Sequence, residues 1–222
     1  MRIVCVGYRD WATTIYHKLV LEFPDYEFIL QLNEDDFCET TIVKFQPDLV
    51  LFYGWSQIIP ERLVTTYSCL MLHPSPLPKY RGGSPIQNQI IRGETNSAVT
   101  IFLMDKGIDT GPIAKQKEID LTGSLDEVFE RISTTGFELT CKILCEGLSV
   151  YAQDEREATF FSRRKSCESE ITLDELTNQS SVYLYNKIRM LQDPYPNAFF
   201  KTSDGKRIVL KHVSIEDVET KL

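Results

Sequence analysis

The sequence has no long apolar run and few histidines. None of its hydrophobic stretches reaches the roughly 18 residues needed to cross a bilayer, which predicts no transmembrane helix and no membrane partner. Residues 1–7 lack the layout of a signal peptide, so we expect a cytoplasmic protein. The six cysteines include no Cys-x-x-Cys pair, and the three histidines are far from Cys141 and Cys145, which predicts free thiols and no metal site.

Basic residues are also in the minority. The chain of 222 residues has 24 Lys and Arg against 32 Asp and Glu, a net charge of −8. Because nucleic acids are bound by a positive surface excess, this balance predicts that the protein has no nucleic-acid partner. A local basic patch would suit a small anionic ligand better than a long polyanion. The remaining composition, 42% hydrophobic and 25% charged, is typical of a globular protein of one or two domains.

The first part of the chain alternates strand-like and helix-like segments. Strands are predicted at 2–6, 26–30, 49–53 and 69–72, with helices at 11–23, 37–45 and 60–63 between them. This rhythm favours an α/β fold with a parallel sheet and crossover helices. Ligands bind such sheets beyond the carboxyl ends of the strands, where Gly7-Tyr8, Tyr53-Gly54 and His73-Pro74 fall.

The rest of the chain is predicted to finish this core and add a small appendage. Ser84-Pro85 is typical of a hydroxyl-capped helix start, strands follow at 98–104 and 112–119, and a capping box at 124–127 opens a helix that reaches about Tyr151. The polar segment 153–165 suits a linker. A helix at 183–191 and strands at 198–202 and 207–212 around a turn predict an α+β appendage that ends in a β-hairpin. We therefore divide the chain into a core (1–152) and a linker, helix and hairpin (153–222).

One stretch, HPSPLPKYRGGSP (residues 73–85), stands out chemically. A buried-looking strand delivers His73 to the sheet edge, and three prolines stiffen the loop that follows. Two cations, Lys79 and Arg81, and two glycines then precede a helix start, an arrangement that can hold an anion. From these residues alone, a structural histidine and a solvated loop remain alternatives.

A second unusual stretch is GIDTGP (residues 107–112), which lies 36 positions after His73 when counted to Asp109. Asp and Gly favour turns, so a hairpin turn is one interpretation. The other interpretation pairs Asp109 with His73, because a carboxylate beside an imidazole fixes its orientation and raises its basicity.

Together the two motifs resemble those of formyltransferases that use N10-formyltetrahydrofolate. This resemblance implies a Rossmann-like formyltransferase core, N10-formyltetrahydrofolate as co-substrate, and catalytic roles for His73 and Asp109. The family has an asparagine two positions before the histidine, where this chain has Met71, which cannot donate a hydrogen bond. Gln87 and Asn88 are candidates to supply that donor.

The resemblance also implies an acyl transfer in which an amine attacks the formyl carbon. A protonated His73 is the candidate donor to the developing oxyanion, and His73 or a water held by Asp109 is the candidate proton acceptor. The loop after the third strand matches the family's folate-binding position, which assigns Tyr53, Gly54, Trp55 and Ile58 to the cofactor. An aromatic-rich corner of the core is the alternative interpretation of this loop.

Three relatives within this family differ in their acceptors. The loop after the first strand lacks the glycine- and asparagine-rich pattern of glycinamide ribonucleotide formyltransferases, and the chain is shorter and more acidic than methionyl-tRNA formyltransferases. Sugar N-formyltransferases fit better, because their post-core motifs resemble RRKSCESEI (163–171) and IRMLQDPYPNAF (188–199). We interpret Arg163 and Arg164 as a solvated or structural pair rather than a ligand site.

This resemblance implies that the acceptor is the amine of a nucleotide-linked 4-amino-4,6-dideoxyhexose, such as GDP-perosamine, destined for lipopolysaccharide O-antigen. The substrate-binding candidates are Lys79, Tyr80, Arg81, Gly82 and Gly83. A homodimer is expected, with the hairpin at 198–212 as its edge. Two alternatives remain: a formyltransferase for another amine (methionyl-tRNA or a small metabolite), and a non-catalytic folate- or nucleotide-binding module.

Overall fold

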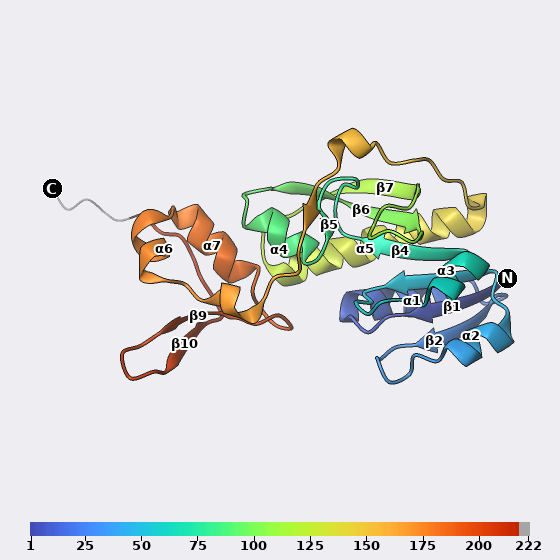
Figure 1. Cartoon of the computed structure of the whole chain (residues 1–222), viewed down its shortest axis with the longest axis horizontal. Helices are drawn as coiled ribbons and strands as arrows, with labels where there is room; N and C mark the ends of the chain where they lie inside the picture. Colours follow the sequence, from blue (N-terminus) through green and yellow to red (C-terminus); the bar gives the residue numbers. More distant parts are fainter. Residues whose placement is uncertain (218–222) are drawn as a thin grey trace.

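A six-stranded sheet with the order β2-β1-β3-β4-β6-β7 forms the centre of the computed structural model, which describes residues 1–217 (Figure 1). The end of the predicted appendage, 218–222, lies outside the described residues. Strands β2, β1, β3 and β4 are parallel, whereas β6 is antiparallel to both β4 and β7. The strands are β1 (Arg2–Val6), β2 (Glu27–Gln31), β3 (Leu49–Tyr53), β4 (Cys69–His73), β6 (Asn96–Leu103) and β7 (Ile113–Asp120).

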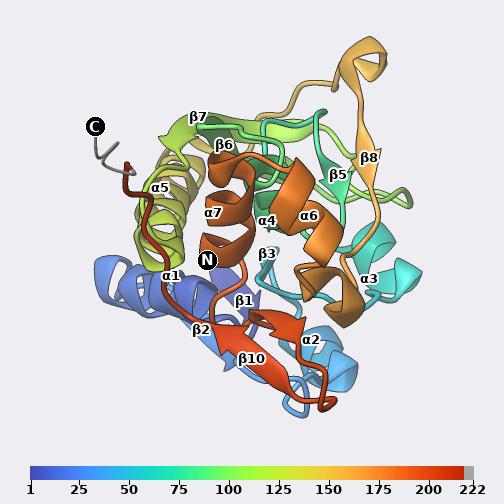
Figure 2. The same ribbon diagram turned by 90° about the vertical axis from the view of Figure 1, so that its left-hand side faces the viewer.

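Helices cover both faces of the sheet (Figures 1 and 2). On one face, α1 (Asp10–Glu22) and α5 (Leu125–Glu146) bury Ile15 and Ile132 against Leu51. On the other face, α2 (Glu39–Phe45) and α3 (Glu61–Thr66) bury Ile42 and Leu63 against the opposite side of the same strands. This double cover explains why all five side chains of β3 are apolar and buried, as in parallel strands generally.

Helix α5 begins as predicted but ends earlier. The Ser124–Glu127 capping box is present, with the Ser124 hydroxyl accepting from the Glu127 N–H. The helix ends at Glu146 rather than near Tyr151, because Gly147 adopts φ +86° and turns the chain away. Tyr151 instead pairs with Ile113 at the edge of the sheet.

The start of α4 (Pro85–Ile90) differs from the predicted hydroxyl cap. Ser84 lies in the left-handed region at φ +51°, and its side chain makes no cap hydrogen bond. Its Oγ accepts a hydrogen bond from the backbone N–H of Arg164 instead. The serine therefore joins two distant segments rather than satisfying its own helix.

The segment predicted as a linker, 153–165, contains a strand that pairs with the proline-rich loop in a separate two-stranded sheet. In this segment β8 (Phe160–Phe161) pairs in parallel with β5 (Arg81–Gly82), which is the end of the proline-rich loop. The pairing places this segment against the stretch that carries His73, so it is not a free linker.

The C-terminal part contains α6 (Leu173–Asn178), α7 (Ser181–Arg189) and a hairpin of β9 (Ala198–Lys201) and β10 (Arg207–Leu210). Ile188 and Ala198 belong to the main apolar core, and the buried Arg189 donates to the carbonyls of Leu121 and Gly123. The predicted α/β core with a small C-terminal part ending in a β-hairpin is therefore confirmed. Among residues 1–217, no helix is both long and apolar enough to cross a membrane.

Candidate active site

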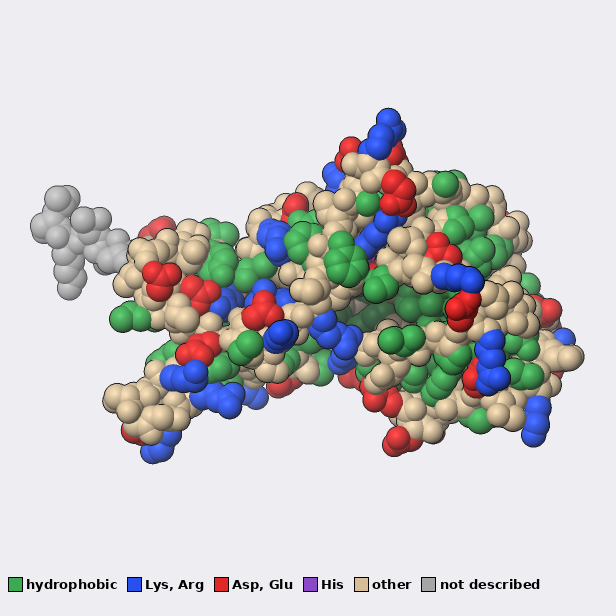
Figure 3. Space-filling view, in the orientation of Figure 1, with side chains coloured by type: hydrophobic (Ala, Val, Ile, Leu, Met, Phe, Trp, Pro, Cys, Tyr) green, Lys and Arg blue, Asp and Glu red, His purple; other side chains and the backbone are tan. Residues whose placement is uncertain are grey.

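A cavity of about 1010 Å³ opens at the carboxyl ends of β1, β3 and β4, as expected for a parallel sheet. Its walls come from the loop after β3, the start of α4, the loop between β6 and β7, the 160–164 segment and the loop before β9. Figure 3 shows the molecule hollowed on this face. The volume is ample for a substrate of the size of a nucleotide or a pterin.

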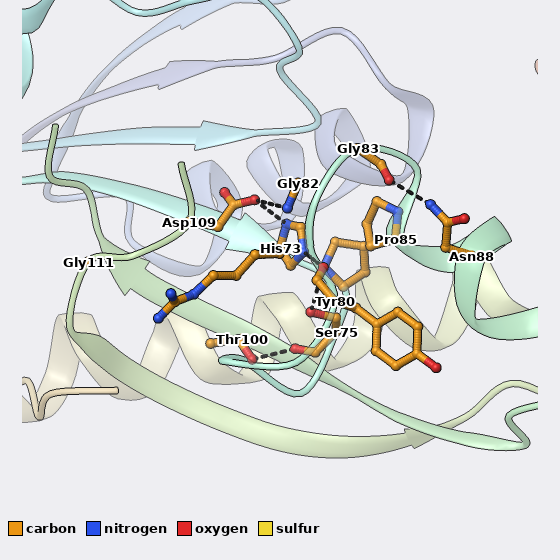
Figure 4. A network of polar contacts seen from close by, with 12 residues as sticks. His73, Ser75, Tyr80, Gly82, Gly83, Pro85, Asn88, Thr100, Asp109 and Gly111 are labelled. Atoms are coloured by element: carbon orange, nitrogen blue, oxygen red, sulfur yellow. Dashed lines mark hydrogen bonds and ion pairs between the residues drawn. The ribbon is translucent and has the colours of Figure 1, made fainter. Parts of the chain in front are cut away.

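His73 ends β4 on the wall of this cavity and is 6% exposed. Its Nε2 lies 2.8 Å from the backbone carbonyl of Tyr80 (Figure 4). A carbonyl only accepts, so Nε2 carries a hydrogen, and in the neutral form of the ring the lone pair is on Nδ1. Nδ1 faces Asp109 Oδ2 at 3.5 Å. The pairing of these two residues, which the sequence left open, is present in the structure.

Two hydrogen bonds hold Asp109 in place. Its backbone lies in the left-handed region at φ +55°, and the Gly82 N–H donates to its Oδ2 at 2.8 Å (Figure 4). The amide of Gln153 donates to the carbonyls of Asp109 and Gly111, at 2.9 and 2.7 Å. These bonds fix an otherwise unfavourable backbone conformation, and they aim the carboxylate at His73.

Side-chain hydrogen bonds to backbone carbonyls hold the loop that contains the Tyr80 carbonyl. Thr100 Oγ1 donates to the Ser75 carbonyl at 2.6 Å, and the fully buried Ser75 hydroxyl donates to the Lys79 carbonyl at 2.8 Å. Gln116 donates to the Leu77 carbonyl at 3.0 Å. This chain of bonds fixes the acceptor that sets the hydrogen position on His73.

Three buried donors on the cavity wall have no hydrogen-bond partner within residues 1–217. They are Trp55 Nε1, Gln87 Nε2 and Arg164 Nε. An unsatisfied buried donor costs roughly 1–3 kcal/mol, so such groups mark a place where a ligand supplies acceptors. Met71 lines the same wall and supplies none.

Gln87 and Asn88 were both candidates for the missing donor, and the structure distinguishes them. The Asn88 amide donates to the Gly83 carbonyl at 2.9 Å, and Asn88 does not line the cavity (Figure 4). Gln87 lines the cavity, is 3% exposed and keeps its Nε2 unpartnered among the described residues. Of these two amides, Gln87 is therefore the one whose donor is left for a ligand.

The cations of the proline-rich loop do not line the cavity. Lys79 Nζ lies 3.5 Å from Glu157 Oε2, and the buried Arg81 guanidinium bonds to Gln153 and to both carboxylate oxygens of Glu155. The bond to Glu155 raises the pKa of Arg81, and it lowers the pKa of the Glu155 carboxyl. The geometry thus gives Arg81 the role of tying the 153–165 segment to the loop.

The other residues predicted to bind ligands also fall into two groups, those that line the cavity and those that do not. Tyr80 stacks on Phe161 and donates to Glu94 away from the cavity, and burial with this bond raises its pKa to about 12. Tyr53 is fully buried, and its hydroxyl pairs with Thr140. The predicted residues that do line the cavity, besides His73 and Asp109, are Gly54, Trp55, Ile58, Gly82 and Gly83.

Several cavity residues had no clear signal in the sequence. Arg9 lies three positions after the end of β1, and its place beyond the carboxyl end of a parallel strand could have indicated it. Arg163 and Arg164 line the cavity, so ligand contact is open to them besides the predicted role as a solvated or structural pair. Gln87 was a candidate donor from the sequence, whereas Gln153 was not foreseeable, because the carbonyls to which it donates, those of Asp109 and Gly111, lie more than 40 positions earlier in the chain.

The family model described as formyl transferase matches residues 18–144. The chain belongs to the formyl transferase family. A curated relative, the methionyl-tRNA formyltransferase of Nitratiruptor sp., is 30% identical over 85% of this chain and 73% of its own length. The methionyl-tRNA formyltransferase of Campylobacter curvus is 32% identical, and only 53% of its length is covered.

Solved structures of formyl transferases share the fold. A methionyl-tRNA formyltransferase from Clostridium thermocellum is 32% identical with a TM-score of 0.89, covering 97% of this chain and 94% of that one. A 4-N formyltransferase from Francisella tularensis is 20% identical with a TM-score of 0.77, covering 98% of both chains. HypX from Aquifex aeolicus, solved in complex with tetrahydrofolic acid, is 19% identical with a TM-score of 0.80, covering 96% and 37%.

Formyl transferases are N-formyltransferases, and the family uses N10-formyltetrahydrofolate as its formyl donor. The residues of this chain fit that group. The cavity is large enough to admit it, and the unpartnered donors of Trp55 and Gln87 match the carbonyl-rich acceptors of a folate. The chain is therefore an enzyme of this family.

Proposed function

We propose that the enzyme transfers the formyl group of N10-formyltetrahydrofolate to the amine of a nucleotide-linked amino-dideoxy sugar. One observation carries the chemistry: His73 Nδ1 and Asp109 Oδ2 lie 3.5 Å apart on the wall of a cavity large enough for both substrates. In the transfer, the bond between N10 and the formyl carbon breaks, and the bond between that carbon and the amine forms. One proton moves from the amine to N10.

His73 and Asp109 are suited to move that proton. The Nε2 hydrogen of His73 is committed to the Tyr80 carbonyl, so only Nδ1 is free to take a proton from the attacking amine. Protonation there creates an imidazolium beside the Asp109 carboxylate, which stabilises the charge. His73 thus acts as general base, then as general acid, and Asp109 orients and stabilises it.

Gln87 is suited to bind the formyl oxygen. Its unpartnered Nε2 belongs to the lining of the cavity that His73 also lines, and Met71 in that lining has no donor. A buried amide donor stabilises the negative charge that develops on the oxygen during attack. We assign Gln87 this role in place of the asparagine that the family resemblance leads one to expect.

The acceptor is proposed on three supports. The net charge of −8 disfavours a long polyanion such as tRNA. The cavity wall includes three arginines, Arg9, Arg163 and Arg164, which suit a small anionic substrate. The 163–171 and 188–199 motifs resemble those of sugar N-formyltransferases.

Methionyl-tRNA is a second candidate acceptor, because relatives at 30–32% identity are named for that substrate. A panel of acceptors separates the two. The full chain is mixed with N10-formyltetrahydrofolate and either methionyl-tRNA or GDP-, dTDP- and UDP-linked 3- and 4-amino-dideoxy sugars. We expect tetrahydrofolate release only with a nucleotide sugar. Release only with methionyl-tRNA would overturn the sugar assignment, and folate binding without turnover on any acceptor would indicate a non-catalytic module.

We also propose that the enzyme is a homodimer joined through the outer edge of β10. Ile208 and Val209 on this strand are 47% and 49% exposed, and the two-stranded hairpin leaves that edge unpaired among residues 1–217. An exposed apolar edge strand is suited to pairing with a second copy. Light scattering should give a dimer mass for the parent and a monomer mass for Ile208→Asp. A monomeric parent would contradict the proposal.

A further inference from the structure

Arg9 has an environment unlike that of the other arginines near the cavity. Its guanidinium carbon lies 5.2 Å from the ring centre of Tyr8 and 5.5 Å from that of Tyr195. Tyr8 follows β1 in the core, whereas Tyr195 belongs to the loop before β9 in the C-terminal part. We call Arg9 with these two rings the Arg9 clamp. It joins the two parts of the chain at the cavity wall.

The clamp holds its cation without a carboxylate. Within residues 1–217, no side-chain hydrogen bond or ion pair involves the Arg9 guanidinium, whereas Arg62, Arg81 and Arg156 each pair with an acid. Contact with aromatic rings occupies the faces of a guanidinium and leaves its N–H edge available. Arg9 lines the cavity, so an incoming anion can reach that edge.

Two further cations line the same cavity from the 160–164 segment. The Arg164 backbone N–H donates to Ser84 Oγ, and the guanidinium donates to the Glu168 carbonyl and lies 3.8 Å from the Glu168 carboxylate. Its buried Nε nevertheless has no partner in the described part of the chain. Arg163 passes so close to Gly83 that a β-carbon on that glycine would lie 2.4 Å from the Arg163 Cα. The backbone of both arginines thus packs directly against Gly83 and Ser84 at the cavity wall.

We infer that the Arg9 clamp, with Arg163 and Arg164, binds the diphosphate of the acceptor. This inference rests on the proposed function for the identity of the acceptor. Charge-assisted bonds from guanidinium groups are the strongest that proteins offer to phosphoryl oxygens, and a diphosphate carries enough charge for several of them. The clamp is completed by Tyr195 from the C-terminal part, so that part helps to bind the acceptor rather than only covering the core.

The glutamate carboxylates of the folate are also anions that arginines can bind. A binding experiment distinguishes them from the diphosphate of the acceptor. The two tryptophans of the chain, Trp11 and Trp55, both line the cavity, and Trp55 contacts Tyr8 with ring centres 5.5 Å apart. Their fluorescence reports ligands without any turnover. The full chain is titrated with inorganic pyrophosphate, with GDP, dTDP and UDP, and separately with p-aminobenzoylglutamate.

Arg9→Gln is the test variant, and Arg2→Gln is its matched control. Arg2 stands at the other end of β1 and also lies over an aromatic ring, that of Phe45 at 6.0 Å, but it does not line the cavity. We expect Arg9→Gln to weaken binding of pyrophosphate and of the preferred nucleoside diphosphate about ten- to hundred-fold. Arg9→Lys keeps the charge without the planar stacking, so its affinity for diphosphate should lie between those of the parent and of Arg9→Gln. Arg2→Gln should bind as the parent does.

Unchanged diphosphate affinity in Arg9→Gln, or no diphosphate binding by the parent, would overturn the inference. Weaker binding of p-aminobenzoylglutamate alone would assign the clamp to the folate and overturn it as well. Because the readout is binding, these results are distinct from failure of the proposed function. That failure would appear as absent formyl transfer in a chain that still binds the diphosphate through Arg9.

Discussion

Gln87 and Asn88 are neighbours in α4, and their different environments define the chemistry of the site. The Asn88 amide donates to a backbone carbonyl, whereas the buried Gln87 Nε2 on the cavity wall has no acceptor among the described residues. A donor without a partner destabilises the folded protein unless a ligand supplies an acceptor. The position is therefore better explained by binding than by stability.

Replacing Gln87 with leucine separates these two explanations. Because the variant removes an unpartnered buried donor, we expect its melting temperature to stay equal to or above that of the parent. Because it also removes the donor to the formyl oxygen, kcat should fall about 10²- to 10³-fold. Thermal melts and steady-state kinetics of tetrahydrofolate release measure both effects.

Gln89→Leu is the matched control for this prediction. Gln89 is a buried amide in the same helix, but its Nε2 donates to the carbonyls of Pro74 and Pro85 at 3.0 Å each. That variant should lower the melting temperature. A Gln87→Leu enzyme that loses stability and keeps its kcat would show that Gln87 is structural.

The sequence predicted the pairing of His73 with Asp109 better than it predicted which residues line the cavity. His73 and Asp109 stand in short motifs with fixed spacing, and their meeting follows from where the strands end. Lys79 and Arg81 were expected in the cavity, yet their acidic partners lie more than 70 positions later in the chain. Nothing in the local sequence distinguishes a cation that awaits a ligand from one already paired.

Among the elements, the 160–164 segment depends on the absence of a side chain at Gly83. A β-carbon there would lie 2.4 Å from the Arg163 Cα and 2.5 Å from its backbone nitrogen, closer than atoms can approach. Gly83→Ala should therefore displace the segment, destabilise the fold by about 1–3 kcal/mol and weaken diphosphate binding. Thermal denaturation and the fluorescence titration test the two parts of this prediction.

Gly93→Ala provides the comparison. Gly93 has φ +83° and open space around it, so alanine there meets backbone strain without any clash. This variant should lower the free energy of unfolding by about 1 kcal/mol and bind diphosphate with the affinity of the parent. Equal loss of binding in both variants would show that the close approach at Gly83 does not position the arginines.

Helix α6 is joined to α7 by an ion pair with a defined pH dependence. The buried Lys187 Nζ lies 2.6 Å from Glu175 Oε1 and donates to the Glu170 carbonyl. Burial alone would raise the pKa of Glu175, but bonds from Lys187 and from the Thr172 N–H more than offset it, so the pKa is lowered. A lowered folded pKa means that the pair stabilises the protein above the usual range of a glutamate and loses that effect as the pH falls.

Glu175→Gln should therefore destabilise the protein by about 1–3 kcal/mol at pH 7, since it leaves Lys187 buried without its partner. The difference from the parent should shrink as the pH falls below the usual glutamate value of 4.5 toward the lower pKa of the folded state. Denaturant unfolding across this pH range measures it. Glu34 is exposed and has no ion pair among residues 1–217, so Glu34→Gln should neither destabilise the protein nor change the pH dependence of its stability. A stability difference between Glu175→Gln and the parent that does not change with pH would contradict the role given to the Lys187–Glu175 pair.

The elements themselves were largely foreseeable, because hydrophobic periodicity and caps are local. β3 (Leu49–Tyr53) and the capping box of α5 match the prediction, and the hairpin of β9 and β10 falls within the predicted ranges. The role of 153–165 was not foreseeable, because it depends on the tertiary pairing of Phe160–Phe161 with the proline-rich loop. The end of α5 has a local cause, Gly147, which the prediction of a helix as far as about Tyr151 overlooked.

For the whole molecule, the apolar core extends through both parts of the chain. Ile188 and Ala198 from the C-terminal part share one core with Ile15 and Ile132, and Arg189 bridges the parts through two carbonyls. We propose that the segments 1–152 and 153–222 are structural units of one cooperative fold. Calorimetry should show one transition whose calorimetric and van't Hoff enthalpies agree. Two separate transitions would show that the C-terminal part folds independently.

The central claim is that His73 carries out formyl transfer in the cavity at the carboxyl ends of β1, β3 and β4. The most direct test compares His73→Ala with His17→Ala, which replaces an exposed histidine of α1 away from the cavity. Tetrahydrofolate release and the mass gain of one formyl group on a nucleotide-linked amino sugar are followed. We predict turnover by the parent and by His17→Ala, and a loss of about 10²- to 10⁴-fold in kcat for His73→Ala. Turnover by His73→Ala at the parent rate would contradict the account.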